Sequence, residues 1–295
     1  MGLIALKAKG STSCAPPHRS RISGRPTVSE RSEALTAERL RAALGERPFR
    51  FFETISSTND VARTWASEGA PHGAVVVTEF QAQGRGRFGR RWQAPSGTAL
   101  LFSVILRPAN AAISVTRYTM AAAVAVRSAL LDQLGLEAES VKLKWPNDIQ
   151  LHGCKVCGIL IEPLWRGAAL EAIIVGIGLN VRVPFDSAEL RATATSLEAH
   201  LQATVDRALL LAQILDHLEF WTARLEGTAL FQAWRAALNT LGERVQAIDV
   251  STAQPIAVGQ ALDVDEDGAL LVRTDDGTIR RVVAGEITLQ LPKVE

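Results

Sequence analysis

Hydrophobic positions in residues 36–106 recur with a helical period in some segments and in short continuous runs in others. Thr36 followed by "AERLRAAL" predicts a capped short helix that ends at Gly45, and "RFFETI" predicts a first strand. "STNDVARTWASEG" predicts a second helix. Residues 75–80 and 98–106 are largely β-branched or apolar and predict two buried strands. The loop between these strands is therefore anchored on a rigid sheet at both ends.

The alternation of helix and strand patterns continues to residue 241. "RYTMAAAVAVRSALLDQLG" is apolar nearly all round and predicts a mostly buried helix that ends at Gly135. "VKLKWPNDIQLHGCKVCGILIEPLW" predicts a strand, a proline turn, a short strand, a turn at Gly153 and a long strand. "LEAIIVGIGLNV" predicts another strand, where Gly176 and Gly178 would let a flat ligand lie against the backbone. "RALLLAQILDHLEFWTARL" and "ALFQAWRAALNTLG" predict two amphipathic helices.

The pattern changes from Arg244 onward to short alternating runs separated by turn dipeptides. Two Asp-Gly pairs in "ALDVDEDGALLVRTDDGTIRRVVAGEITLQL" predict β-hairpins. We therefore expect a tail at residues 1–35, a larger domain at 36–241 and a small β-barrel domain at 242–295.

Composition narrows the class of protein. The chain has 295 residues and 47% apolar residues, enough for a sizeable core. Its formal net charge is +1, so it lacks the overall basic excess of a nucleic-acid coat. No apolar run approaches the about 18 residues needed to span a bilayer. Three cysteines do not make a disulfide framework in a chain of this length, which favours a soluble protein in the reducing cytoplasm.

The first thirty residues contain no acid before Glu30 and show no apolar periodicity, which predicts a disordered tail. Lys7 interrupts the short apolar stretch "GLIALKA", so we do not expect a secretory signal. The acid-poor Arg/Ser composition leaves an organellar transit peptide as the alternative.

The stretch "GRGRFGRRW" at residues 84–92 indicates an anionic ligand. Glycine lets the backbone approach a ligand closely, and arginine supplies a forked set of donors suited to carboxylate and phosphate. The ligand could be a nucleotide in a pocket or the phosphate backbone of RNA. A solvated surface loop without a ligand is the third interpretation.

Five strings occur in order: "STN" at residues 57–59, "QAQGRGRFGRRW" at 81–92, "KWPND" at 144–148, "KVCGIL" at 155–160 and "GIGLNV" at 176–181. Together with the β-rich end in "GEITL", they resemble the biotin protein ligase family. The resemblance covers roughly residues 50–290. Where many relatives have glycine before Ser-Thr-Asn, this chain has Ser56.

The resemblance implies an α+β fold: a class II aminoacyl-tRNA synthetase-like catalytic domain, with a mixed sheet flanked by helices, and a C-terminal SH3-like β-barrel. It implies that biotin and MgATP form biotinoyl-5'-AMP, and that biotin then passes to a lysine of a biotin carboxyl carrier protein or domain. Only about fifty residues precede "RFFETI", too few and too irregular for a winged helix-turn-helix, so we expect no DNA binding. We expect no membrane association, and we leave open a homodimer through an edge of the sheet.

Electrostatics explains why such a reaction needs cations. The carboxylate of biotin is already ionised at neutral pH, so the difficulty is its repulsion by the phosphates of ATP. By resemblance, Lys155 bridges the carboxylate and the α-phosphate, and the arginines of the loop clamp the intermediate while Gly84, Gly86 and Gly89 let the loop fold over it. The biotin-binding residues implied in this way are Ser57, Thr58, Asn59, Gln81, Arg85, Gly86, Arg87 and Lys155.

On the nucleotide side, the resemblance assigns Trp92 to packing on adenine and Asn180 to a hydrogen bond with the nucleotide. Arg90, Lys144 and Asn147 are further ATP-binding candidates. Lys155, Arg85 and Arg87 are the implied catalytic cations, and Asp148 is our hypothesis for the group that helps the carrier lysine lose its proton. The Mg²⁺ ligands are unknown from the sequence.

Several residues also have simpler interpretations. Ser57 and Thr58 could cap the helix that follows them, and Trp145 is better explained as a core aromatic. Cys154 and Cys157 form a C-x-x-C motif after His152, but one such pair has no fourth ligand for zinc, and Cys157 is expected to be a buried filler.

Two alternative functions stay open at this point. A lipoate or octanoate protein ligase shares the fold and also charges a carrier lysine, although the set of Ser57, Thr58 and Gln81 suits a urea better. A binding module that uses the Arg/Gly loop for RNA is the alternative from a different class.

Overall fold

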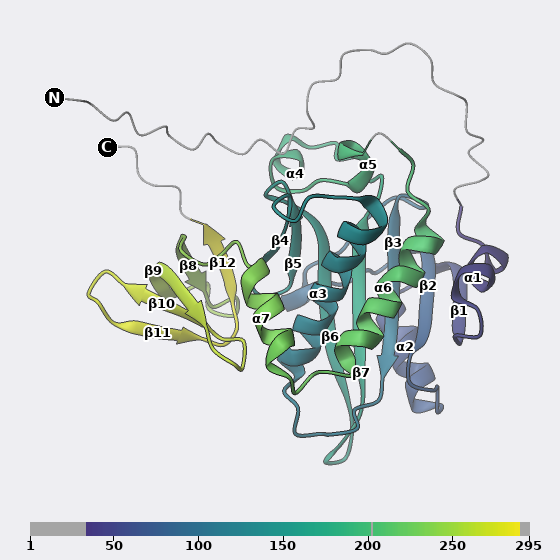
Figure 1. Ribbon diagram of the computed structural model, residues 1–295, viewed down its shortest axis with the longest axis horizontal. Coiled ribbons are helices and arrows are strands. Elements are labelled where there is room, and N and C mark those ends of the chain that lie inside the picture. Colours follow the sequence, from purple (N-terminus) through teal and green to yellow (C-terminus); the bar gives the residue numbers. More distant parts are fainter. Residues whose placement is uncertain (1–33, 202, 290–295) are drawn as a thin grey trace, which may run out of the picture.

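A seven-stranded sheet organises the larger part of the molecule (Figure 1). The computed structural model describes residues 34–201 and 203–289. The strand order is β1-β2-β3-β7-β6-β5-β4; β1 and β2 are parallel and every other neighbouring pair is antiparallel, so the sheet is mixed. The strands are β1 (Phe49–Ile55), β2 (Ala74–Gln81), β3 (Ala99–Leu106), β4 (Val141–Lys144), β5 (Asp148–Leu151), β6 (Cys154–Arg166) and β7 (Ala169–Asn180).

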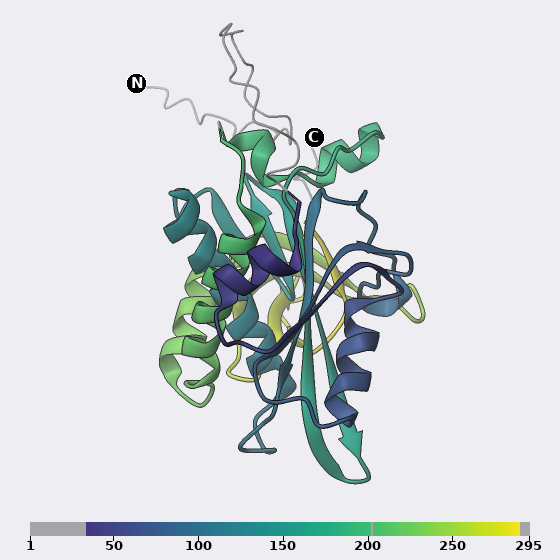
Figure 2. The ribbon, with the colours of Figure 1, turned by 90° about the vertical axis from the view of Figure 1, so that its right-hand side faces the viewer.

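Helices cover the two faces of this sheet unequally. Figure 2 shows the sheet edge-on, with α2 on one side and α3, α6 and α7 on the other. On the α2 side, small residues such as Ala62 and Ala66 pack on β-branched residues of the strands, including Val76 and Ile174. The helices are α1 (Ala37–Leu44), α2 (Thr58–Ser67), α3 (Val115–Leu134), α4 (Ala188–Thr193), α5 (Leu197–His200), α6 (Arg207–Thr222) and α7 (Thr228–Ala237). None of the helices in the described part of the chain is long and apolar enough to cross a membrane.

The C-terminal part forms a small antiparallel sheet in the order β11-β10-β9-β8-β12. Both predicted Asp-Gly hairpins are confirmed, because Gly268 joins β9 to β10 and Gly277 joins β10 to β11, each with a positive φ. The strands are β8 (Arg244–Ile248), β9 (Pro255–Val264), β10 (Leu270–Thr274), β11 (Ile279–Val282) and β12 (Glu286–Leu289). The predicted α+β fold, a mixed sheet flanked by helices with a small C-terminal β-sheet, is confirmed.

Trp145 joins the two sheets. Its side chain is 2% exposed, and its indole N–H donates to the carbonyl of Gly268 at 2.9 Å. A Cβ at Gly268 would lie 2.6 Å from Cγ2 of Thr116 in α3, so only glycine allows the hairpin to approach this helix. The interpretation of Trp145 as a core aromatic is confirmed.

The short helices α4 and α5 were not predicted, because four to six residues are too few to show a helical period. Residues 1–33 of the expected disordered tail lie outside the described residues. Leu35, the last residue of the expected tail, instead packs in the folded part. It is 4% exposed, and its N–H donates to Oε1 of Glu79 at 2.6 Å.

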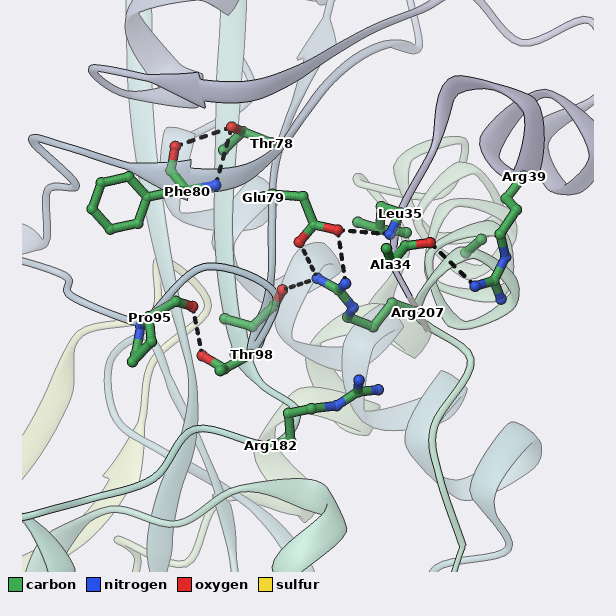
Figure 3. Close-up of polar contacts among 12 residues, drawn as sticks. Ala34, Leu35, Arg39, Thr78, Glu79, Phe80, Pro95, Thr98, Arg182 and Arg207 are labelled. Atoms are coloured by element: carbon green, nitrogen blue, oxygen red, sulfur yellow. Dashed lines mark hydrogen bonds and ion pairs between the residues drawn. The ribbon is translucent and has the colours of Figure 1, made fainter. Parts of the chain in front are cut away.

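Glu79 belongs to a buried ion pair that ties β2 to α6 (Figure 3). Both nitrogens at the end of the Arg207 guanidinium donate to this carboxylate, at 2.6 and 2.8 Å, and one of them also donates to the carbonyl of Ala99. The side chain of Arg207 is fully buried. A buried charge is tolerated only when it is paired and hydrogen-bonded, so both members are needed together.

We expect Arg207→Met to lower the free energy of unfolding by about 3 to 5 kcal/mol, because the carboxylate of Glu79 would lose its buried counter-ion. Chemical denaturation followed by circular dichroism measures this change. The matched control is Arg39→Met, which removes a partly exposed ion pair with Asp206 at 2.6 Å and should cost less than about 1 kcal/mol. Equal losses in the two variants would contradict the assignment.

Candidate active site

One row across the seven-stranded sheet leaves the backbone uncovered at its centre. Direct strand partners place Leu101, Gly178, Gly158, Asp148 and Lys144 side by side on β3, β7, β6, β5 and β4. Directly paired residues project from the same face of a sheet. On this face, Gly178 and Gly158 therefore separate Leu101 from the two charged residues Asp148 and Lys144. The strands therefore form the floor of a hollow.

A second glycine site continues this floor toward α2. Gly176 pairs with Ser103 on β3 and with Leu160 on β6. A methyl group at Gly176 would collide with the carboxamide of Asn59, the second residue of α2. Glycine is required here because the helix N-terminus approaches the strand so closely.

A cavity of about 620 Å³ lies over these glycines. This volume is in the range of sites for small ligands and cofactors. Of the predicted site residues, the structure brings all but one to the cavity: Ser57, Thr58, Asn59, Gln81, Arg85, Gly86, Arg87, Arg90, Trp92, Lys144, Asn147, Asp148 and Lys155. The exception, Asn180, is 5% exposed at the end of β7 and donates from Nδ2 to the carbonyl of Thr195 at 3.2 Å.

The Arg/Gly loop forms a compact turn at the cavity. The N–H of Gly86 donates to the carbonyl of Arg90 at 2.7 Å, and the N–H of Trp92 donates to the carbonyl of Gly84 at 2.9 Å. Phe88, at the tip, has a φ of 56° and is 47% exposed. This turn brings four arginines (Arg85, Arg87, Arg90 and Arg91) and Trp92 to the lining of the cavity.

Trp92 lies over the glycine floor. A Cβ at Gly178 would be 2.6 Å from Cε2 of the indole, and one at Gly158 would be 2.9 Å from Cζ3. The ammonium of Lys155 lies 5.7 Å from the ring centroid, within the range of a cation–π contact. The indole nitrogen is buried and has no hydrogen-bond partner among the described residues.

The cations of the site are held in place by neighbours. Nζ of Lys155 lies 2.7 Å from Oδ1 of Asp148. Nη1 of Arg87 donates to Oδ1 of Asn147 at 3.2 Å, and Asn147 in turn donates to the carbonyl of Ile159 at 2.6 Å. These contacts hold a lysine and an arginine against two consecutive residues, Asp148 and Asn147, where the chain enters β5.

Arg85 is held by two carboxylates. Nη1 lies 2.7 Å from Oδ1 of Asp60, and Nη2 lies 3.3 Å from Oε2 of Glu162. Partial burial lowers the pKa of Arg85, but the hydrogen bond and charge of Asp60 and the charge of Glu162 raise it more, so the pKa is above its ordinary value. Arg85 is thus a permanent cation at the edge of the cavity.

Neutral polar groups gather at the N-terminus of α2, beside Arg85. Oε1 of Gln81 accepts from the backbone N–H of Thr58 at 2.8 Å and from its hydroxyl at 3.1 Å. Ser103, which is fully buried, lies with its hydroxyl 2.7 Å from the hydroxyl of Thr58 and 2.6 Å from Oδ1 of Asn59. Ser57 is the N-cap residue of α2, but its side chain makes no capping hydrogen bond.

The balance of charge favours an anionic ligand. Six cationic side chains line the cavity, namely Arg85, Arg87, Arg90, Arg91, Lys144 and Lys155, against the two carboxylates of Asp148 and Glu189. The cavity therefore combines a cationic region with a neutral hydrogen-bonding end.

The C-x-x-C motif lies in the interior of the molecule. Cys154 and Cys157 are both fully buried, and no group of three His, Cys, Asp or Glu residues suited to a metal occurs in the described part of the chain. Burial raises the pKa of the Cys157 thiol, and the charge of Asp148 raises it further. The expectation that Cys157 is a buried filler is confirmed.

Sequence reasoning missed several parts of the site. Glu189 and Thr193 of α4 and Gly285 and Ile287 of the C-terminal sheet also line the cavity. Helix α4 is too short for a pattern to reveal it, and the C-terminal residues reach the cavity only through the docking of the two sheets. Ser103 was missed because it lies within an otherwise apolar strand.

Comparison with known proteins agrees with this geometry. Residues 51–180 match the model of the "Biotin/lipoate A/B protein ligase family", and residues 240–289 match the "Biotin protein ligase C terminal domain". The chain is 34% identical to a biotin--[acetyl-CoA-carboxylase] ligase of Paracoccus denitrificans, over 75% of this chain and 92% of that protein. It is 31% identical to the ligase of the same name from Mycobacterium tuberculosis, over 89% of this chain and 96% of that protein.

Among solved structures, the chain is similar to the biotin protein ligase from Aquifex aeolicus in complex with biotin and ATP. The TM-score is 0.69 at 26% identity, over 82% of this chain and 98% of the other. The resemblance seen in the five sequence strings is thus confirmed. The chain is a ligase of the biotin/lipoate A/B protein ligase family, and it carries the C-terminal domain of the biotin protein ligases.

Proposed function

We propose that this protein is an ATP-dependent biotin protein ligase, which forms biotinoyl-5'-AMP and then transfers the biotinoyl group to a carrier lysine. One observation carries the proposal: a single cavity holds a neutral hydrogen-bonding end, with Ser57 and Gln81, and a cationic region, with Arg87 and Lys155. Biotin has a neutral urea at one end and a carboxylate at the other, and it matches both.

In the first step, an oxygen of the biotin carboxylate attacks the α-phosphorus of ATP, the bond to the β-phosphate breaks, and pyrophosphate leaves. The carboxylate is already ionised, so the step requires no base. Two unit charges about 4 Å apart interact by roughly 4 kcal/mol in a partly screened site. Lys155, beside the glycine floor, is the cation we assign between the two anions, and Arg85 and Arg87 hold the intermediate.

In the second step, the amine of the carrier lysine attacks the acyl carbon, the bond to the phosphate oxygen breaks, and AMP leaves. An unperturbed lysine has a pKa of about 10.4, so it must lose a proton before attack. Asp148 lines the cavity, with Oδ1 2.7 Å from Nζ of Lys155. We assign Asp148 to accept or guide this proton.

ATP is used as its Mg²⁺ complex in this proposal. The described residues contain no cluster of three candidate metal ligands. Magnesium retains several waters and is commonly bound through substrate phosphates with one or two carboxylates. Asp148 and Glu189 are the carboxylates of the cavity that could contribute, and the metal would neutralise phosphate charge.

Trp92 is the residue we assign to the adenine ring, because its indole already lies across the floor made by Gly158 and Gly178. Arg90, Lys144 and Asn147 line the same cavity and are assigned to the phosphates and ribose. We assign Asn180 an indirect role, since it bonds to Thr195 rather than lining the cavity.

The acceptor we propose is the carrier protein or domain of a biotin-dependent carboxylase. Support comes from the relatives in Paracoccus denitrificans and Mycobacterium tuberculosis, which are named for acetyl-CoA carboxylase.

The test of the function is ATP–pyrophosphate exchange with biotin, lipoate and octanoate offered separately. We expect exchange with biotin only, because Gln81 and Thr58 form a hydrogen-bonding end that an alkyl chain would leave unsatisfied. Exchange that is faster with lipoate or octanoate would make this chain a lipoate or octanoate ligase instead.

We expect Lys155→Ala to reduce biotinylation of a carrier domain by about 30- to 4,000-fold, because the two anions of the first step would lose the cation between them, at a cost of about 2 to 5 kcal/mol. Mass spectrometry of a carrier domain incubated with biotin and MgATP measures the product. Lys142→Ala is the matched control, since Lys142 pairs with Glu139 and does not line the cavity. Similar yields from both variants would contradict the role of Lys155.

We expect Asp148→Asn to slow transfer from preformed biotinoyl-AMP by about 100-fold or more, because the neutral amide accepts a proton poorly. Single-turnover transfer to the carrier domain is compared with pyrophosphate exchange. A larger loss in transfer than in exchange supports a proton role. An equal loss in both steps would mean that Asp148 acts only by holding Lys155, and an unchanged transfer rate would exclude it.

A further inference from the structure

Glu162 is a carboxylate that the proposed chemistry does not use, although it lies directly behind the neutral end of the cavity. It projects from β6, its side chain is 23% exposed, and it does not line the cavity. Its oxygen Oε2 accepts from Nδ2 of Asn59 at 2.8 Å and lies 3.3 Å from Nη2 of Arg85. Arg63 approaches the same oxygen at 3.6 Å.

This carboxylate decides which way the carboxamide of Asn59 points. An ionised carboxylate can only accept hydrogen bonds, so the NH₂ group of Asn59 must face it. The carbonyl of the amide then points the other way, where it accepts from the hydroxyl of Ser103 at 2.6 Å. Asn59 is 3% exposed and packed against Gly176, so water cannot readily replace either partner.

The side-chain amide of Gln81 is also held in one orientation, but by a backbone group and not by a carboxylate. Its carbonyl accepts from the backbone N–H of Thr58 at 2.8 Å, which directs its NH₂ group away from the helix. The orientation of Gln81 therefore depends on the backbone. The orientation of Asn59 depends on one charged side chain.

We propose that Glu162 is a positioning residue for the urea of biotin: by fixing the carboxamide of Asn59, it leaves the second lone pair of the carbonyl, beside the Ser103 hydroxyl, as an acceptor for a urea N–H. This inference rests on the proposed function. A urea offers donors at its nitrogens and an acceptor at its oxygen. A flipped Asn59 would set an N–H against an N–H and leave both unsatisfied.

Glu162 also contacts Arg85, so an effect of Glu162 on biotin binding through Asn59 must be distinguished from an effect through Arg85. Asp60 provides the matched control, because it pairs with Arg85 at 2.7 Å and makes no contact with the Asn59 carboxamide. Removing the charge of Asp60 therefore disturbs the arginine and leaves the amide alone.

The experiment measures binding of biotin and of biotinol, in which a hydroxyl replaces the carboxylate, by calorimetry. We expect Glu162→Gln to weaken both ligands about tenfold or more, since the urea is common to them, and Asp60→Asn to change biotinol affinity by less than about threefold, since biotinol lacks the carboxylate on which Arg85 would act. Unchanged binding of both ligands to Glu162→Gln would overturn the inference. A loss confined to biotin would also overturn it, because the effect would then act through Arg85 on the carboxylate.

A double-mutant cycle gives the second readout. In an Asn59→Ala background, Glu162→Gln should change biotin affinity by less than about twofold, because the amide that the carboxylate orients is absent. Equal effects in both backgrounds would show a general structural role and would overturn the inference. Should the unmodified protein bind no biotin at all, the proposed function fails, which is a different result from biotin binding that is insensitive to Glu162.

Discussion

The bare backbone at the centre of β6 and β7 is the constraint on which the rest of the site depends. Gly158 and Gly178 leave room for Trp92, and Gly176 leaves room for the N-terminus of α2. A side chain at Gly158 or Gly178 would collide with the Trp92 indole, and one at Gly176 would collide with the carboxamide of Asn59. Cationic side chains lie around this hollow, where two anionic reactants would bind. The attraction between these cations and the anions is stronger in a partly screened site than in bulk water.

The two faces of the seven-stranded sheet differ in how their charged side chains are balanced. On the face covered by α6, the carboxylate of Glu79 and the guanidinium of Arg207 neutralise each other and are closed from solvent. On the other face, cationic side chains outnumber carboxylates around the cavity. The first arrangement stabilises the fold, and the second provides positive charge for a ligand. One sheet can serve both purposes because its faces are separated by the backbone.

The C-terminal sheet is part of the site as well as an added domain. Trp145 donates to Gly268 across the contact between the sheets, immediately before the turn that carries Asn147 and Asp148. Gly285 and Ile287 of the same sheet line the cavity. The position of the catalytic turn and one wall of the cavity therefore depend on how the two sheets dock, to which the ion pair of Arg235 with Asp263 also contributes. The proposed domain boundary near residue 241 separates two sheets but not two independent functions.

The sequence by itself determined the elements and most of the site. Hydrophobic periods located the strands and long helices, Asp-Gly pairs located the hairpins, and the five strings identified the family and nearly all lining residues. Local sequence could do this because propensities and motifs are short-range. Only the tertiary structure showed that Ser103 and Glu162 lie behind Asn59, that Asn180 turns to Thr195, and that Ile287 reaches the cavity. These contacts join strands and helices far apart in the chain, and strand register and sheet docking decide them, which no local pattern encodes.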